Sequence, residues 1–240
     1  MLLTMTSCGS VLPWNKSEPI NEVNLAFVLD HNLLYLPDAD VNGVRGRMIF
    51  GSATARTILD PAFFQRIRAG RYAFHMGHRA EFDFSPVVLE LGDVGDAVIG
   101  ADVWRGGAVT IDYRAGLLTY QMDGIHPAYM TLFNFRDEPA ITIRVNGADM
   151  PAIVDTSVPD TLILPRGSGS AGRRSAHVAI AGTDFGTVDI ATGDVATARL
   201  GNRLLSRFLI SIDYQRRVVG IWRDPRIPLR EPPHAPAPKK

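Results

Sequence analysis

An aspartate, a hydroxyl residue and a small residue interrupt an otherwise apolar stretch of the chain, VNGADMPAIVDTSVPDTLILP, at residues 145–165. Ile153 and Val154 lead directly into Asp155, and the chain becomes apolar again at Leu162. A carboxylate at the end of a buried strand costs several kcal/mol unless it is hydrogen-bonded or functional. Asp155 is therefore the first candidate for chemistry, as an acid or a base.

The composition is that of an ordinary globular protein. The 240 residues carry 25 basic and 25 acidic side chains, and 46% of them are hydrophobic. This balance gives no basic surplus for nucleic-acid binding, and no apolar stretch approaches the roughly 18 residues of a membrane span. The single cysteine excludes an internal disulfide framework and a cysteine-built zinc site.

Two blocks of sequence occur twice. Val41-Asn42-Gly43 recurs at 145–147, a shift of 146 − 42 = 104, and Ile111-Asp112-Tyr113 recurs at 212–214, a shift of 213 − 112 = 101. Such self-similarity indicates a duplicated structural unit. We therefore expect two copies of one fold, connected in tandem.

Each copy has the pattern of a β unit with little helix. The segments 23–37 and 129–145 are rich in β-branched, aromatic and aliphatic residues, as half-buried strands are. The two Asn-Gly pairs predict tight hairpin turns. Short helices are expected at 61–68 (PAFFQRIR) and after the glycines of VIGADVW and RLGNRLLSR, each of the latter followed by a strand–Asp-Tyr–strand hairpin.

The order of these motifs resembles the aspartic peptidase superfamily, and most closely its retropepsin-like branch in the bacterial aspartyl protease form. VDTSVPDTLIL stands where that family has its Asp-Thr-Gly loop, and LGNRLLSRFLISIDY where it has its glycine-led helix and closing hairpin. The resemblance implies an all-β, two-lobed pepsin/retropepsin-like fold with short helices. The first lobe would span 20–122 and the second 123–222.

In that family each lobe contributes one aspartate to a dyad that holds a water molecule. One carboxylate takes a proton from the water while its partner, kept protonated by like-charge repulsion, donates to the scissile carbonyl. The resemblance makes Asp155 a dyad member, with Thr156 and Ser157 completing its loop. It also implies that Thr156 and Ser52 brace the two lobes through mutual hydroxyl–backbone bonds.

The partner of Asp155 is missing from the sequence. The 104-residue shift places Asp155 on Gly51, so the first loop reads Gly51, Ser52, Ala53. The nearby acids Asp40 and Asp60 lie outside this loop. Asp112 and Asp213 belong to the closing hairpins, where exposed structural roles are expected for them. We therefore expect half a dyad, which cannot run the mechanism.

The second loop also departs from the family pattern. Ser157 stands where the family has glycine, which predicts a backbone strain of about 1 kcal/mol. Without a charged partner, Asp155 should behave as an ordinary hydrogen-bonded carboxylate. The alternative role for Asp155 is a strand-to-turn cap that accepts backbone N–H bonds and performs no chemistry.

Other chemistry-bearing residues give weaker signals. His75 and His78 could present two imidazoles to a metal, but Glu81 and Asp83 do not complete a triad, so a solvated loop is expected and neither metal nor cofactor is predicted. Flaps over a cleft are expected at 70–86 and 166–187, with GRRSA (172–176) as a flexible loop. The alternating aromatics, expected to pack in the core rather than line a peptide groove, are Tyr72, Phe74, Phe82 and Phe84.

The two ends of the sequence predict extended segments. The opening MLLTMTSCGS resembles the end of a lipoprotein signal, which would make Cys8 a lipidated membrane anchor, residues 1–19 a leader and spacer, and the protein exported. The alternative is a frayed terminus with a chance cysteine. Residues 223–240 are rich in proline and are expected to be disordered.

The sequence thus predicts an exported, aspartic-peptidase-like protein with an inter-lobe cleft for an extended peptide or protein segment, catalytically impaired by Gly51. Two alternatives stay open. A homodimer could pair Asp155 with its symmetry mate and restore peptidase activity, or the protein could be a surface lipoprotein that serves as a scaffold without enzymatic function. No nucleic-acid partner is expected.

Overall fold

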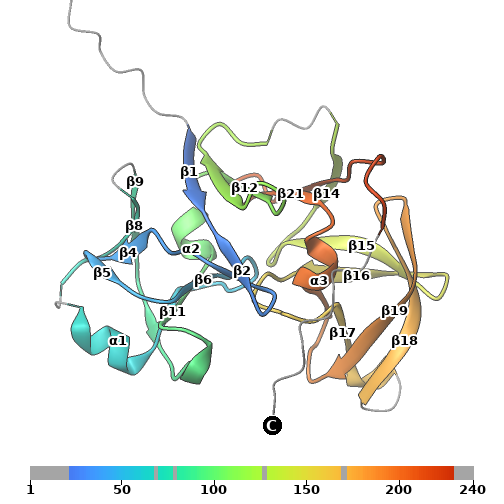
Figure 1. Ribbon diagram of the computed structural model, residues 1–240, viewed down its shortest axis with the longest axis horizontal. Helices are drawn as coiled ribbons and strands as arrows, with labels where there is room; N and C mark the ends of the chain where they lie inside the picture. The colour runs from blue at the N-terminus through green and yellow to red at the C-terminus, as the bar shows by residue number, and fades with distance from the viewer. Residues whose placement is uncertain (1–21, 68–69, 78–79, 126–128, 169–171, 230–240) are drawn as a thin grey trace, which may run out of the picture.

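The computed structural model describes residues 22–67, 70–77, 80–125, 129–168 and 172–229 (Figure 1). Within these residues the protein is all-β, with twenty-two strands and three α-helices of four to six residues. The predicted fold class is confirmed at this level. Residues 1–21, which include Cys8 and the predicted leader, and residues 230–240 of the predicted tail lie outside the described residues.

The first half of the chain contains thirteen strands, two α-helices and a 3-10 turn, η1 (Gly92–Val94). The strands are β1 (Glu22–Ala26), β2 (Val28–Asp30), β3 (Leu33–Tyr35), β4 (Ala39–Val41), β5 (Val44–Arg45), β6 (Met48–Phe50), β7 (Ile58–Leu59), β8 (Tyr72–Met76), β9 (Ala80–Phe84), β10 (Val87–Val88), β11 (Ala97–Ile99), β12 (Ala108–Asp112) and β13 (Leu117–Gln121). The helices are α1 (Pro61–Arg66) and α2 (Ala101–Trp104).

The second half contains nine strands, one α-helix and a 3-10 turn, η2 (Arg166–Ser168). The strands are β14 (Thr131–Asn134), β15 (Ala140–Val145), β16 (Ala148–Val154), β17 (Leu162–Pro165), β18 (Gly172–Ile180), β19 (Thr183–Gly193), β20 (Ala198–Leu200), β21 (Leu209–Asp213) and β22 (Val218–Trp222). The helix is α3 (Asn202–Leu205).

A six-stranded sheet joins the two halves. Its order is β1-β13-β12-β21-β22-β14, so the first half supplies three neighbouring strands and the second half the other three. The central strands β12 and β21 are antiparallel, and Thr110 faces Ser211 at the middle of their register. The hydroxyl oxygens of these two residues are 2.8 Å apart. Thr110 and Ser211 are equivalent positions of the 101-residue repeat, since 211 − 110 = 101. The two copies of the repeat therefore pair with each other at the centre of the sheet.

Beyond this sheet, the two halves repeat one pairing pattern. In the first half β6 runs parallel to β11 and pairs Ile49 with Val98. In the second half β16 runs parallel to β20 and pairs Ile153 with Arg199. The first of these pairs belongs to a six-stranded sheet (β10-β7-β11-β6-β3-β2), and the second to a closed barrel (β15-β16-β20-β17-β19-β18).

The predicted turns and helices are confirmed. Asn42 and Asn146 have positive φ (51° and 49°) and are followed by glycines that also do, as two-residue hairpins require. Asp60 caps the first helix by accepting a hydrogen bond from the Ala62 N–H (2.9 Å). Gly201 precedes α3 because a Cβ there would lie 2.2 Å from the Asp160 carbonyl oxygen. Glycine is thus required where that helix meets the turn after β16.

The aromatic residues of β8 and β9 pack in the core, as predicted. Phe74 and Phe82 contact Trp104 with ring centroids 5.4 and 5.7 Å apart, and Trp104 is fully buried. Tyr72 lies against Phe84 at 6.1 Å. These rings therefore stabilise the first half by burying apolar area and by edge contacts, and they do not line a groove.

Hairpins lie in both regions where flaps are expected. In β8–β9 the strand β8 pairs with β4 and β9 ends the sheet, while β18 pairs with β15 and β19 runs parallel to β17. Each hairpin is therefore anchored to a neighbouring strand. The prediction of a flexible GRRSA loop is wrong, because Gly172 begins β18 and residues 172–176 pair with β19.

Two further expectations need correction. Asp213 is structural, as predicted, but it is only 1% exposed, and its carboxylate accepts hydrogen bonds from the backbone and guanidinium of Arg216. The predicted tail is structured at its start, since Asp224 is 8% exposed and its carboxylate binds the Arg226 guanidinium.

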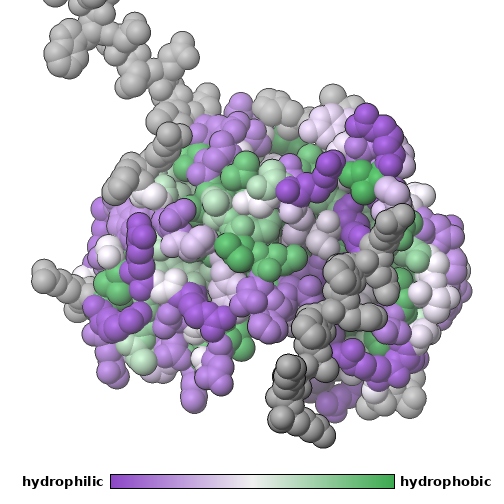
Figure 2. Space-filling model, viewed as in Figure 1, coloured by the Kyte–Doolittle hydropathy of each residue, from purple (hydrophilic) through white to green (hydrophobic). Residues whose placement is uncertain are grey.

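Apolar side chains reach the surface at several places, among them Val28 and Leu29 of β2, which are 54% and 42% exposed. Figure 2 shows several hydrophobic areas on a mostly polar face, one of them near its centre, where β2 lies in Figure 1. Among the described helices none has the length and apolar character needed to cross a bilayer.

The tyrosines of the two closing hairpins predict a loss of folding stability at alkaline pH. Burial raises the pKa of Tyr113 and Tyr214 well above the ordinary value, and their hydroxyl groups donate to the buried Asn202 and Ser52. Above about pH 10 the unfolded state loses phenolic protons that the folded state retains. The contribution of these two tyrosines to stability should therefore be constant below about pH 10 and fall as the pH rises further.

The free energy of unfolding, measured by urea titration between pH 8 and about 11.5, should fall less steeply in Tyr214→Phe than in the wild type because one raised group is gone. Equal slopes would show that Tyr214 does not titrate abnormally.

Candidate functional site

Two short loops face each other where the halves meet, one after β6 and one after β16. The Ser52 N–H donates to Thr156 Oγ1 (2.9 Å), and the Thr156 N–H donates to Ser52 Oγ (3.0 Å). Each hydroxyl also donates to the strand before the opposite loop, Ser52 to the Val154 carbonyl and Thr156 to the Phe50 carbonyl, both at 2.6 Å. The predicted mutual hydroxyl–backbone bonds are therefore present, and both residues are fully buried.

Asp155 lies beside this pair and is only 2% exposed. Its N–H donates to the Leu200 carbonyl (3.0 Å), which ties the loop to the start of α3. Carboxylate Oδ1 accepts hydrogen bonds from the Ser157 N–H (3.0 Å) and hydroxyl (2.5 Å). Carboxylate Oδ2 accepts one from Nη1 of Arg199 (2.5 Å). Both oxygens of Asp155 are therefore occupied by donors of the protein itself.

Arg199 connects Asp155 to a second carboxylate. Its Nη2 donates to Oε1 of Glu138 at 3.2 Å, and its side chain is 29% exposed. Burial by itself lowers the pKa of the Arg199 guanidinium, but the hydrogen bonds and charges of Asp155 and Glu138 outweigh burial and hold that pKa above its usual value. The result is a row of alternating charge, from Asp155 through Arg199 to Glu138, that reaches from the interior to the surface.

The equivalent place in the first half is apolar. Val98 occupies the position of Arg199, since 199 − 98 = 101, and it packs with Leu33 and Ile49. A Cβ on Gly51 would lie 2.6 Å from both Val98 Cγ1 and Thr54 Oγ1. The space that a second aspartate side chain would need is therefore filled by other side chains.

The expectations about the aspartate loop are partly wrong. Ser157 is not among the described residues with positive φ, so it adopts this turn without the predicted strain. Its side chain instead closes a local turn on the Asp155 carboxylate. The expectation that Asp155 has no charged partner is also wrong, because Arg199 is that partner.

A buried asparagine and a tyrosine hold the two loops in place. Asn202, at the start of α3, donates from Nδ2 to the carbonyls of Thr156 and Asn32, both at 2.6 Å. Its Oδ1 accepts a hydrogen bond from the Tyr113 hydroxyl (2.7 Å). The Tyr214 hydroxyl donates to the Ser52 carbonyl (2.9 Å). The loops are therefore braced from both halves, and the β2–β3 hairpin is tied to α3.

The remaining candidate residues lie elsewhere. His75 Nδ1 is 2.6 Å from Oδ1 of Asp40, and His78 lies outside the described residues. Across the part of the chain that the structure describes, no three His, Cys, Asp or Glu side chains gather as a metal site. Asp60 caps α1, and the backbone N–H groups of Arg114 and Ala115 donate to Asp112. These carboxylates have local structural roles.

The geometry favours a structural role for Asp155. An acid–base dyad needs two carboxyl groups that share one proton, yet among the described residues the donors to Asp155 are Ser157 and Arg199, and no carboxylate bonds to it. An arginine remains charged, so the group that faces Oδ2 of Asp155 is a cation and not a second carboxyl group. The arrangement is that of a buried ion pair and differs from a dyad in which two carboxyl groups share a proton.

Arg199 and Glu138 were not predicted from the sequence. One signal was available, because the 101-residue shift places Arg199 on an apolar residue, Val98. A charged side chain in a strand next to a buried aspartate indicates an ion pair. The parallel pairing of β16 with β20, which brings the pair together across 44 residues, is not encoded in any local motif.

Comparison with known proteins does not assign the chain to a family. No family model matches the chain, and no curated protein is significantly similar to it.

Thr156→Val tests the hydroxyl pair. The valine removes the acceptor of the Ser52 N–H and the donor to the Phe50 carbonyl, and burying those groups without partners should lower the free energy of unfolding by about 3 kcal/mol. Thr119→Val removes a surface hydrogen bond to Asn24 and should cost less than about 0.5 kcal/mol. Similar losses for the two variants in urea unfolding would contradict a special role for Thr156.

Gly51→Asp tests whether the missing acid can be restored by a single substitution. The new side chain meets Val98 and Thr54, so the variant should lose about 3 kcal/mol of stability from overpacking and from an unpaired buried charge. Gly167→Asp is the matched control, since nothing lies within 4 Å of a Cβ there. A Gly51→Asp protein as stable as Gly167→Asp would show that the site is open to a second carboxylate.

Proposed function

We propose that this protein is a two-lobed relative of the retropepsin-like aspartic peptidases that binds an extended peptide or protein segment without cleaving it. The observation that carries the proposal is the state of Asp155. The residue stands in a loop that is paired with its duplicate, yet its carboxylate is buried and bonded to Arg199. Export, and membrane anchoring through Cys8, belong to the same proposal and rest on the sequence around that cysteine.

Three features of the fold support the relationship. The halves share a symmetric sheet, their loops exchange hydroxyl–backbone bonds, and a glycine-led helix follows the same strand in each. The duplicated pattern covers most of the described residues. The identity of the two halves as peptidase lobes is the part that remains our inference.

The edge strand β2 supports peptide binding. It ends the sheet β10-β7-β11-β6-β3-β2, and all three of its residues are exposed. The hairpin that contains it touches the second half through Asn32 and Asn202. Extended peptides bind such edges through strand-type hydrogen bonds, and these bonds do not require a dyad. A peptide lying along β2 would therefore run close to the line where the halves meet.

An active homodimer would require Asp155 of two copies to meet. The first half of each chain already occupies the position opposite Asp155, through the Ser52 and Thr156 bonds. The geometry therefore favours the non-catalytic protein over that alternative. A scaffold protein without peptide affinity is the other alternative, and it predicts no response of β2 to peptides.

Incubation with a random decapeptide mixture tests the proposal. Mass spectrometry between about pH 3 and 7, the range in which carboxyl dyads work, should detect no cleavage by the wild type, Asp155→Asn or the exposed control Asp149→Asn. NMR spectra should show shifts of backbone amides in β2. Cleavage that disappears only in Asp155→Asn would establish an active peptidase, and an absence of shifts would favour the scaffold.

A further inference from the structure

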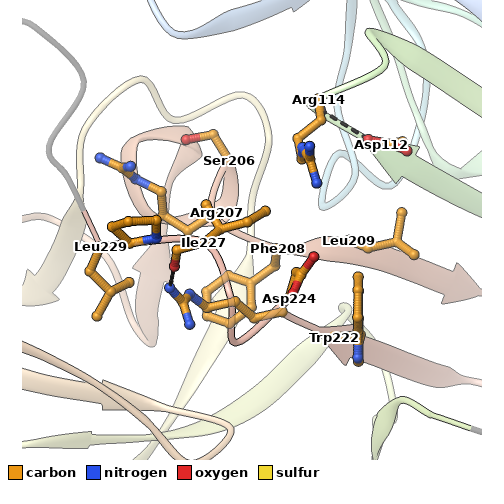
Figure 3. A pocket seen from close by; sticks show the side chains of 12 residues that line it. Asp112, Arg114, Ser206, Arg207, Phe208, Leu209, Trp222, Asp224, Ile227 and Leu229 are labelled. Carbon is orange, nitrogen blue, oxygen red and sulfur yellow. Dashed lines mark hydrogen bonds between the residues drawn. The ribbon is translucent and has the colours of Figure 1, made fainter.

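A cavity of about 280 Å³ lies at the end of the central sheet, away from Asp155 (Figure 3). Three segments form its walls, namely the turn after β12, the residues that follow α3, and the chain after β22. In Figure 3 Arg114 points into the space from the β12 turn, and Phe208 and Asp224 lie across from it. The size is suited to a small organic molecule.

The two closing hairpins differ at this place. Asp112 and Asp213 are equivalent, but the residue equivalent to Arg216 is Ala115, since 216 − 115 = 101. Arg216 Nη1 donates to Asp213 Oδ2 (2.9 Å), and a Cβ on Gly124 would lie only 2.0 Å from that nitrogen. The second hairpin is therefore closed by an arginine. The short Ala115 cannot close the first in the same way.

The lining carries a surplus of positive charge. Arg114 and Arg223 belong to the lining, and Arg226 is paired with one of its carboxylates. Their three positive charges stand against the two negative charges of Asp112 and Asp224, which leaves a net charge of 3 − 2 = +1. Arg226 binds both oxygens of Asp224 at 2.8 and 2.9 Å. Hydrogen bonding from the Arg226 side chain lowers the pKa of Asp224 to about 2. Asp224 and Arg226 therefore form an ion pair whose charges cancel. The charge that remains favours an anion.

The rest of the cavity is apolar. Phe208, Leu209, Trp222 and Leu229 supply side-chain surface between the charged groups. Such walls favour a ring or a short hydrocarbon chain. Because only one positive charge is in surplus and two carboxylates lie nearby, a singly charged carboxylate is favoured over a doubly charged phosphate.

We infer that this cavity binds a small amphipathic carboxylate, with its anionic end at Arg114 and its apolar body between Phe208 and Trp222. A guanidinium offers paired N–H donors that match the two oxygens of a carboxylate. This site lies apart from the two facing loops and β2, so it is independent of the peptide binding proposed above.

Titration of the full chain with 4-phenylbutyrate tests the inference, with 4-phenylbutylamine as a probe of the same shape and opposite charge. The carboxylate should cause saturable NMR shifts of the Trp222 indole N–H, and the buried Trp104 should not respond. The amine should bind at least about tenfold more weakly, because it meets the surplus positive charge. Equal affinity for the two probes would overturn the inference, as would an absence of saturable shifts at Trp222.

Arg114→Gln supplies the matched variant. It should weaken binding of the carboxylate by about tenfold or more through loss of a charge-assisted hydrogen bond. Arg45→Gln, an exposed arginine in the first half, removes the same charge elsewhere and should leave the affinity unchanged. Circular dichroism of both variants checks that the fold is retained. Equal affinities of folded Arg114→Gln and Arg45→Gln would contradict the assignment of Arg114.

Discussion

The four hydrogen bonds between Ser52 and Thr156 and the strands before them are the constraint on which the centre of this structure depends. They are buried, they connect positions 104 residues apart, and each hydroxyl bonds to backbone groups of the opposite half. Because unsatisfied buried groups cost about 1–3 kcal/mol each, the loops are strongly held together. That constraint fixes where Asp155 and Gly51 must lie, whatever their chemistry.

The two halves differ in the side chains that stand at the centre of these loops. The second half retains a buried carboxylate and neutralises it with Arg199, whose other nitrogen binds Glu138. The first half has Gly51 in place of a carboxylate and packs Val98, Leu33 and Ile49 at the equivalent place. The replacement is therefore consistent across several residues, and each half is internally satisfied. In the proposed function, this is what separates the protein from a peptidase.

Local signals in the sequence predicted the local structure well. The Asn-Gly turns and the glycine-led helix α3 depend on residues a few positions apart, and the structure contains both. The hydroxyl pair of Ser52 and Thr156 was also predicted, as something that the resemblance to the aspartic peptidases implies, and the structure contains it.

The contacts between distant strands could not be predicted in the same way. The Asp155–Arg199 pair depends on the parallel alignment of β16 with β20, and the pairing of the two hairpins with β4, β15 and β17 likewise joins distant segments. Ser157 was misjudged because its strain depends on a backbone torsion that the residue type alone does not determine. The cavity next to Arg114 is lined by three segments that lie far apart in the sequence, and no local motif indicates that they meet.

The most direct measurement is a double-mutant cycle between Asp155 and Arg199, with Asp155→Asn, Arg199→Leu and the double variant compared by urea unfolding. If Arg199 neutralises Asp155 in the folded protein, the two residues should be coupled by about 2 kcal/mol or more, because each single change leaves a buried group without its partner. A coupling energy near zero would contradict the account, since Asp155 would then be independent of the arginine and free to act with another acid.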